Sequence, residues 1–214
     1  MAKFSLAEDV YIHPTPAGAF YAVSATEPNP TRKLIQFLLT KESTPPLTLE
    51  GLMAWTEMQD EDQALTLLHH AQSLGWLQGL EKPRQCNDEP LETQLPKLLK
   101  SLSIQGKVLL ADQQGFYLAS SGFPHEVAEE LSALSADLAR LHAPRSGLLV
   151  NNLGLASSAW AIVDAAGNGK LGFWPLFIGA QRFVVVISGI PQFNHPDFVH
   201  LVWAISRRYA LLSG

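Results

Sequence analysis

Apolar residues in the second half of the chain recur with helical spacing in two places. Between residues 125 and 142 they lie four and three positions apart, which puts them on one face of a helix. This stripe consists of Val127, Leu131, Leu134, Leu138 and Leu141. A second helix is expected over residues 196–212, where the spacing repeats and Arg207 and Arg208 lie near the negative end of the helix dipole. We predict that both helices bury their stripes.

Short β-prone runs lie before and between these helices. The runs 108–112 and 116–120 flank a Gln-Gln-Gly segment, which is typical of a tight hairpin turn. Three further strands are expected over residues 157–164, 171–178 and 182–188. A short helix is expected over residues 95–102. The second half therefore reads as helix, two strands, helix, three strands, helix, with a sheet that ends as a meander.

The first half has a different pattern. Two β-prone runs, 10–13 and 19–24, are separated by a Pro-Thr-Pro-Ala-Gly segment, which predicts an opening hairpin. Three helices are expected after it, over residues 31–41, 48–58 and 60–74. Three short helices with flanking strands predict a winged-helix-like unit, so the whole chain is assigned to the α+β class.

A polar segment from Gly79 to Pro90 separates the two halves. It holds two prolines and no apolar periodicity, as expected of a linker. We therefore predict a winged-helix-like domain at residues 1–80, a linker at 81–91 and a second domain at 92–214.

Three motifs in this second domain, together with its order of elements, resemble the roadblock/LC7 family. They are Gly-Lys-Val-Leu-Leu-Ala-Asp at 106–112, Gly-Phe-Tyr-Leu-Ala-Ser-Ser-Gly at 115–122 and Glu-Glu-Leu-Ser-Ala-Leu at 129–134. The resemblance covers roughly residues 92–212. It implies a profilin-like α/β sandwich with a five-stranded antiparallel sheet, homodimerisation, and a regulatory or scaffold role, in bacteria often on small Ras-like GTPases. The family has no catalytic residue to carry over.

The charge of the chain bears on its choice of partner. With 15 Lys and Arg against 20 Asp and Glu, the net charge is −5. The segment 60–74, which would be the DNA-reading helix of a winged helix, has no Lys or Arg and begins with Asp60, Glu61 and Asp62. We therefore expect protein contacts and no nucleic-acid binding. The alternative is a transcriptional regulator whose second domain senses a ligand or dimerises.

Residues that could carry catalysis or bind metal are scattered. His69 and His70 are adjacent on a helix and diverge by about 100°, while His195 and His200 are five apart, which does not aim two imidazoles at one ion. The single cysteine, Cys86, lies in the predicted linker, and no phosphate-binding loop or nucleophile elbow occurs. We predict no enzymatic activity, no cofactor and no metal.

Small residues flank the stripe of the first long helix and suggest an interface. They are Ala128, Ser132, Ser135, Ala136 and Ala139. Small side chains let a second helix approach, so we predict a homodimer that meets through this helix and an adjacent edge strand. The alternative is that these residues are only good helix formers on a partly solvated face.

These patterns together predict a non-enzymatic, dimeric regulatory or scaffold protein that acts through protein contacts, with a small Ras-like GTPase as a candidate partner. The first residues lack the apolar core of a secretory signal, and the best apolar run, Phe183 to Ile187, is far shorter than the ~20 residues of a membrane span. We expect a cytoplasmic protein without membrane insertion.

Overall fold

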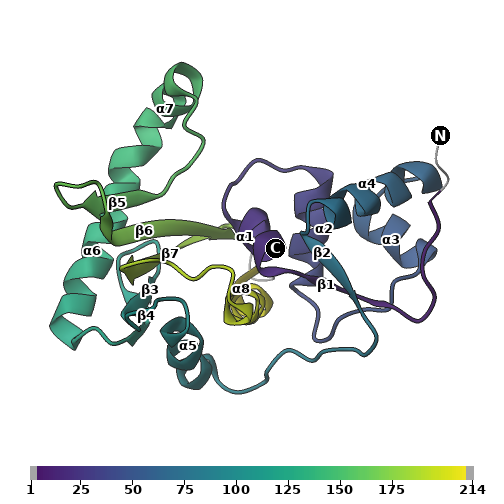
Figure 1. Ribbon diagram of the computed structural model, residues 1–214, viewed down its shortest axis with the longest axis horizontal. Helices are drawn as coiled ribbons and strands as arrows, with labels where there is room; N and C mark the ends of the chain where they lie inside the picture. Colours follow the sequence, from purple (N-terminus) through teal and green to yellow (C-terminus); the bar gives the residue numbers. More distant parts are fainter. Residues whose placement is uncertain (1–3, 211–214) are drawn as a thin grey trace.

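A five-stranded antiparallel sheet forms the centre of the second half in the computed structural model, which describes residues 4–210 (Figure 1). The strand order is β4-β3-β7-β6-β5, and every neighbouring pair is antiparallel. The strands are β3 (Val108–Ala111), β4 (Tyr117–Ser121), β5 (Trp160–Val163), β6 (Gly169–Ile178) and β7 (Gln181–Ser188). The predicted five-stranded antiparallel sheet is confirmed, including the meander at its end.

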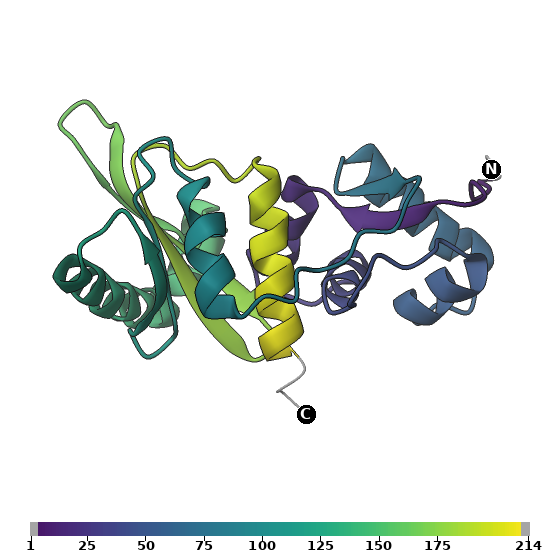
Figure 2. The same ribbon diagram turned by 90° about the horizontal axis from the view of Figure 1, so that it is seen from below.

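Helices cover both faces of this sheet. The helix α6 (His125–His142) lies on one face, and α5 (Leu91–Lys100) and α8 (Pro196–Tyr209) lie on the other (Figure 2). Successive side chains of a strand point to opposite faces, so β7 sends Val184 to the core under α6 and Val185 to the core under α8.

The first half contains a two-stranded sheet and four helices. Strand β1 (Tyr11–Pro14) pairs antiparallel with β2 (Leu77–Leu80), which comes after all four helices. The helices are α1 (Pro16–Val23), α2 (Pro30–Leu38), α3 (Leu49–Thr56) and α4 (Glu61–Ser73). The three helices predicted over 31–41, 48–58 and 60–74 are therefore confirmed, as α2, α3 and α4.

The predicted opening hairpin is wrong, because residues 19–24 lie in and just after α1. The Thr15 hydroxyl accepts a hydrogen bond from the backbone N–H of Gly18 at 3.1 Å, and Pro16 occupies the first helical turn. A capping threonine followed by proline starts a helix, and this outweighs the β propensity of the residues that follow. Strand β1 therefore pairs with distant β2.

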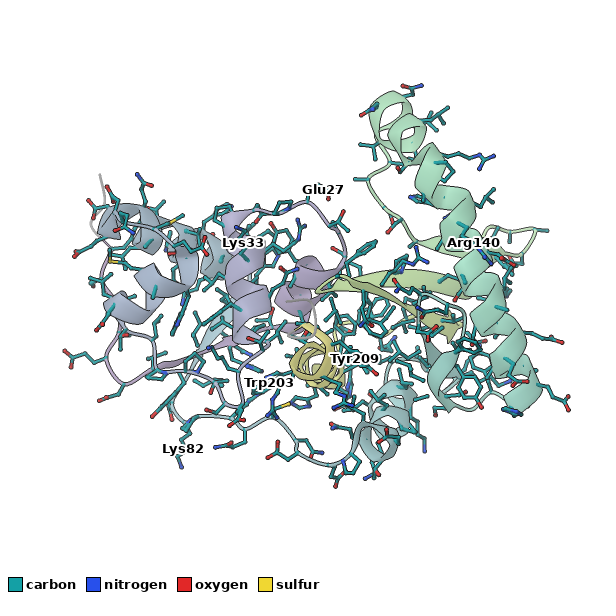
Figure 3. The ribbon with its side chains drawn as sticks, turned by 180° about the vertical axis from the view of Figure 1, so that it is seen from behind. Glu27, Lys33, Lys82, Arg140, Trp203 and Tyr209 are labelled. Carbon is teal, nitrogen blue, oxygen red and sulfur yellow. The ribbon has the colours of Figure 1, made fainter. Side chains whose placement is uncertain are left out.

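Helix α8 joins the two halves through a single hydrophobic core. Eight of its 14 residues are buried, and it contacts α1 as well as α5 and β6. The indole N–H of Trp203 donates to the carbonyl of Lys41 at 2.7 Å (Figure 3). The ring of Phe20 on α1 lies 5.3 Å from that of Phe193 and 6.1 Å from that of Phe198. The predicted domains 1–80 and 92–214 thus share their interior, and the division of the chain into two domains stays a prediction.

The predicted linker, 81–91, is held against the rest of the molecule. The backbone N–H of Cys86 donates to the carbonyl of Glu42 at 2.8 Å, and the Cys86 side chain is buried. Arg207 of α8 pairs with Asp88 at 2.9 Å and with Glu42 at 3.4 Å. The segment therefore has the composition of a linker, but a backbone hydrogen bond and an ion pair fix it to the rest of the molecule.

Other boundaries differ from the prediction. Helix α5 begins at Leu91, four residues before the predicted start, so Pro96 lies inside it. The segment after residue 142, for which no element was predicted, contains the 3₁₀ turn η1 (Ala143–Arg145) and the helix α7 (Ser146–Leu153). The strand predicted over 157–164 is shorter, and the predicted end of the last helix, Leu212, lies outside the described residues.

Candidate interaction surface

Helix α6 buries its small residues against the sheet, whereas its large apolar residues are half-buried or exposed. Ala128, Ser132, Ser135 and Ala136 are buried there. Of the stripe predicted to be buried, Leu131 and Leu138 are half-buried and border the core, whereas the rest is exposed. The exposed members are Val127, Leu134 and Leu141, which keep 38–46% of their surface. The predicted rotation of this helix is therefore wrong.

The close approach of α6 to the β3–β4 turn explains this orientation. A Cβ atom added to Gly115 would lie 3.2 Å from the Cα of Ala133 and 3.3 Å from the Cβ of Ala136. A large side chain on this face would push the helix off the sheet. The hydroxyls of Ser132 and Ser135 donate to carbonyls of their own helix, those of Ala128 and Ser132, so their burial leaves no hydroxyl without a partner.

The five residues predicted as a dimer interface consequently lie inside or at the margin of their own chain. Four of them are buried between α6 and the sheet, and the fifth, Ala139, is half-buried at the wall of a cavity. A second copy cannot reach the buried four while α6 stays on its sheet. The spacing of these small residues does indicate that the helix backbone packs closely against another element. That element is the sheet of the same chain and not a second helix.

The outer side of α6 and the helix after it form an apolar ridge. Helix α7 contains no buried residue, and it projects from the body beyond β5 (Figure 1). The exposed apolar residues of the α6–α7 ridge, together with the residue after the α7 cap, are Val127, Leu134, Leu141, Leu148, Val150, Leu153 and Leu155. The sequence analysis missed α7, although its Leu-Leu-Val-Asn-Asn-Leu run has helical spacing.

Strand β5 lies beside this ridge at the edge of the sheet. It pairs only with β6 among the strands, and all four of its residues are exposed. Its large side chains Trp160, Ile162 and Val163 keep 36%, 52% and 56% of their surface. The Trp160 indole N–H donates to Nδ1 of His142 at 3.2 Å, which ties the strand to the end of α6. An exposed apolar edge of this kind is open to pairing with another strand.

Ion pairs lie next to the ridge and the edge, on α6 and just after β5, and these charged groups do not form a catalytic arrangement. Asp137 and Arg140 form an exposed ion pair on α6. Asp164, which follows β5, accepts from Lys170 at 2.9 Å and from the backbone N–H groups of Ala166 and Asn168. The lysine contact and these hydrogen bonds lower the pKa of Asp164. The carboxylate thus stays ionised and holds the β5–β6 turn closed.

Histidines elsewhere serve packing and capping. The Nδ1 atom of His195 accepts from the backbone N–H of Asp197 at 3.2 Å and caps α8. The His69 ring stacks on Phe4 at 4.1 Å. His13 is buried against Trp203, and burial, with Arg84 nearby, lowers its pKa to about 4. It is therefore neutral at pH 7.

Cys86 lacks the features of a nucleophile. Burial raises the pKa of its thiol, and the neighbouring Arg207 only partly offsets this effect. Within residues 4–210, no three His, Cys, Asp or Glu side chains gather as they would around a metal ion. Nor does any helix in that range have the length and apolar character needed to cross a bilayer.

Comparison with known proteins finds similarity only at the level of solved structures. No family model and no curated protein matches the sequence. A roadblock/LC7 domain from Streptomyces avermitilis is 14% identical, with 54% of this chain and 92% of that chain covered and a TM-score of 0.37. Myxococcus xanthus MglB is 18% identical, covering 56% of this chain and 93% of that one, with a TM-score of 0.32. The gliding protein MglB of Thermus thermophilus is also 18% identical, with 56% and 85% covered and a TM-score of 0.35.

The structures similar to about half of this chain are thus roadblock/LC7 domain structures. With TM-scores this low, none of the three tells what this chain binds.

Proposed function

We propose that this protein is a non-enzymatic regulator or scaffold that acts by binding other proteins through the α6–α7 ridge and the β5 edge. One observation carries the proposal: α7 and β5 together contain 12 residues, and none of them is buried. A helix of eight residues is marginal in water on its own, and an apolar edge strand left open invites aggregation. Both features are accounted for if a partner covers them.

The first occupant we propose for this surface is a second copy of the chain. Antiparallel pairing of β5 with its symmetry mate would extend the sheet across the dimer, and the ridges would pack beside it. The resemblance of residues 92–212 to the roadblock/LC7 family supports a dimer. This dimer uses the same helix as the sequence-based prediction, and again an edge strand, but it uses the opposite face of the helix.

The regulated partner that we propose is a small Ras-like GTPase, and the N-terminal winged-helix-like unit is proposed as a further protein-binding part. The motifs quoted for the second domain support the GTPase. The acidic start of α4, at Asp60, Glu61 and Asp62, supports protein contact over DNA contact for the first half.

Binding to purified candidate GTPases tests this proposal. A purified small Ras-like GTPase is loaded with GDP or a non-hydrolysable GTP analogue and titrated with the full chain. We expect binding that depends on the nucleotide. The Leu153→Arg variant changes the exposed end of α7, and Glu92→Ala changes an exposed charge on α5, on the other face of the sheet, as a control.

Loss of binding in Leu153→Arg with full binding in Glu92→Ala is the expected pattern. Equal binding by both variants would place the partner elsewhere, and no binding in either nucleotide state would remove the GTPase from the proposal.

A further inference from the structure

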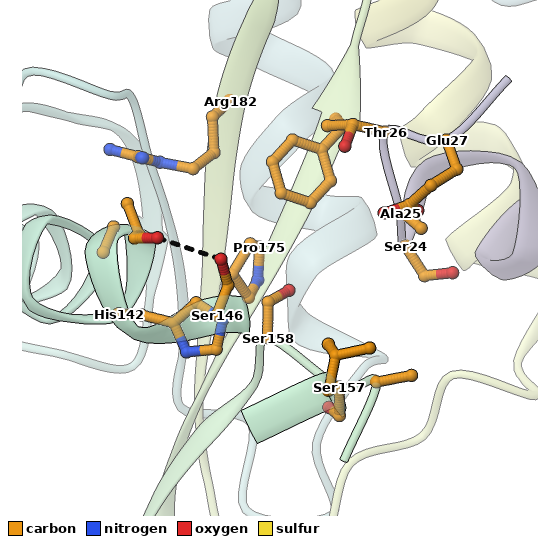
Figure 4. A pocket seen from close by; sticks show the side chains of 15 residues that line it. Ser24, Ala25, Thr26, Glu27, His142, Ser146, Ser157, Ser158, Pro175 and Arg182 are labelled. Carbon is orange, nitrogen blue, oxygen red and sulfur yellow. Dashed lines mark hydrogen bonds between the residues drawn. The ribbon is translucent and has the colours of Figure 1, made fainter. Parts of the chain in front are cut away.

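A cavity of about 290 Å³ lies between the two halves of the molecule (Figure 4). The first half contributes the segment 24–27, which connects α1 and α2. The second half contributes the end of α6, the start of α7, the segment before β5, and the paired strands β6 and β7. A molecule bound here would contact both halves at once.

The most unusual group in the cavity wall is the guanidinium of Arg182. Its Nε atom is buried and has no hydrogen-bond partner among the described residues. No ion pair of Arg182 occurs within residues 4–210, although Glu27 also lines the cavity. Burial and the charge of Arg140 lower the pKa of Arg182, so the cation is held in an unfavourable place. A buried polar group without a partner calls for an explanation.

The position of Arg182 follows from the register of the sheet. Arg182 pairs with Phe177 across β6 and β7, and its neighbour Phe183 points to the core under α8. Alternation therefore places Arg182 on the α6 face of the sheet. Figure 4 shows its guanidinium turned toward α6.

The rest of the wall offers hydrogen-bonding groups and an apolar surface. The hydroxyls of Thr26 and Ser158 line the cavity. Because Nδ1 of His142 accepts from Trp160, the hydrogen of the neutral ring is on Nε2 and is available to a ligand. Phe177 and Pro175 supply apolar surface on β6.

We propose that this cavity binds a small organic anion whose carboxylate or phosphate group pairs with Arg182 and whose apolar body packs on Phe177 and Pro175. An anion supplies the missing partner of the guanidinium, which matches both kinds of group with two parallel hydrogen bonds. The proposal concerns a ligand and not the protein partner, and it does not depend on dimerisation.

Titration calorimetry on the full chain with three probes tests this site. The probes are phenylacetate, phenyl phosphate and the uncharged phenylacetamide, which differ in the group offered to Arg182. We expect at least one anion to bind and phenylacetamide to bind at least about tenfold more weakly, as hydrogen bonds to charged groups predict. Whichever anion binds more tightly identifies the preferred group.

Arg182→Met keeps the length of the side chain and removes its charge. We expect it to lose at least about tenfold in affinity for the anion, while its melting temperature without ligand equals or exceeds that of the wild type, because an unpaired cation has left the wall. The matched control Arg84→Met removes an exposed arginine outside the cavity and should bind as the wild type does.

Three outcomes would overturn the proposal: equal binding of anion and amide, unchanged affinity in a folded Arg182→Met, or no heat from any probe at about 10 mM, a concentration that detects even weak sites. Inorganic phosphate is the last probe in the titration. If it binds as tightly as phenyl phosphate does, the apolar wall contributes nothing and that part of the proposal is wrong.

Discussion

Helices α6 and α8 lie on opposite faces of the same sheet, and both carry apolar residues at helical spacing. Helix α8 buries its stripe residues Phe198, Val202 and Ile205 and is covered on its other side by the first half of the chain. Helix α6 buries alanine and serine and leaves Val127, Leu134 and Leu141 exposed. Periodicity alone does not tell these cases apart. The space above the sheet decides which side of a helix faces it.

The largest difference should appear when the same charge is placed on each stripe. Val202 on α8 is fully buried, and Val127 on α6 keeps 38% of its surface. We expect Val202→Asp to destabilise the monomeric chain by at least about 4 kcal/mol and Val127→Asp by less than about 1 kcal/mol, because only the first charge is buried within the monomer.

Urea unfolding followed by circular dichroism measures both variants. Similar losses of stability would mean that α6 also packs its stripe against its own chain. A wild-type curve with two transitions would show that the halves unfold separately in spite of α8.

The α8 side should also respond to pH through His13, which lies against Trp203 with its ring centre 5.3 Å away. Its pKa of about 4 in the folded chain lies below the usual 6.5. The unfolded chain therefore binds a proton on this residue below pH 6.5 while the folded chain does not, and stability is lost as pH falls from 6.5 to about 4. The loss approaches about 3 kcal/mol.

His13→Gln removes this titration, so the difference in unfolding free energy between wild type and variant should shrink as pH falls through that range. A difference that is constant from pH 7 to pH 4 would contradict the assigned burial of His13. The same substitution at the exposed His70, His70→Gln, serves as a matched control.

On the α6 side, enlarging a small buried residue should cost less than burying a charge. Ala136→Leu places a larger side chain where the helix passes close to Gly115, and we expect a loss of about 1–3 kcal/mol. Ala133→Leu enlarges an exposed side chain one turn earlier in the same helix and should change stability by less than about 0.5 kcal/mol. If the two variants melt at the same temperature, the helix faces the sheet differently.

Much of the sheet and most helices could be predicted from the sequence because turns, caps and periodicity are local. The hairpin around Gly115 and the full extent of α6 are examples. The hairpin expected at residues 10–24 failed because pairing of β1 with β2 depends on contacts across more than 60 residues. The rotation of α6 failed for a similar reason, since the space next to Gly115 is a property of the folded sheet.

The surface and the cavity were harder still to predict. The run 148–153 combines leucines with two asparagines, and no element was predicted for it, so its exposed apolar face was overlooked. Arg182 has no motif around it. Its significance comes from a missing partner in the folded chain, which no sequence pattern can display.

The mass of the full chain in solution, measured by light scattering, tests the central claim that the α6–α7 ridge and the β5 edge form an interface. We expect a dimer at tens of micromolar, a range in which interfaces of standard size associate, and a folded monomer for Ile162→Arg, which places a charge on the exposed edge strand. Glu92→Ala, on the other face of the sheet, should stay dimeric. A monomeric wild type, or an Ile162→Arg variant that dimerises with unchanged affinity, would contradict the claim.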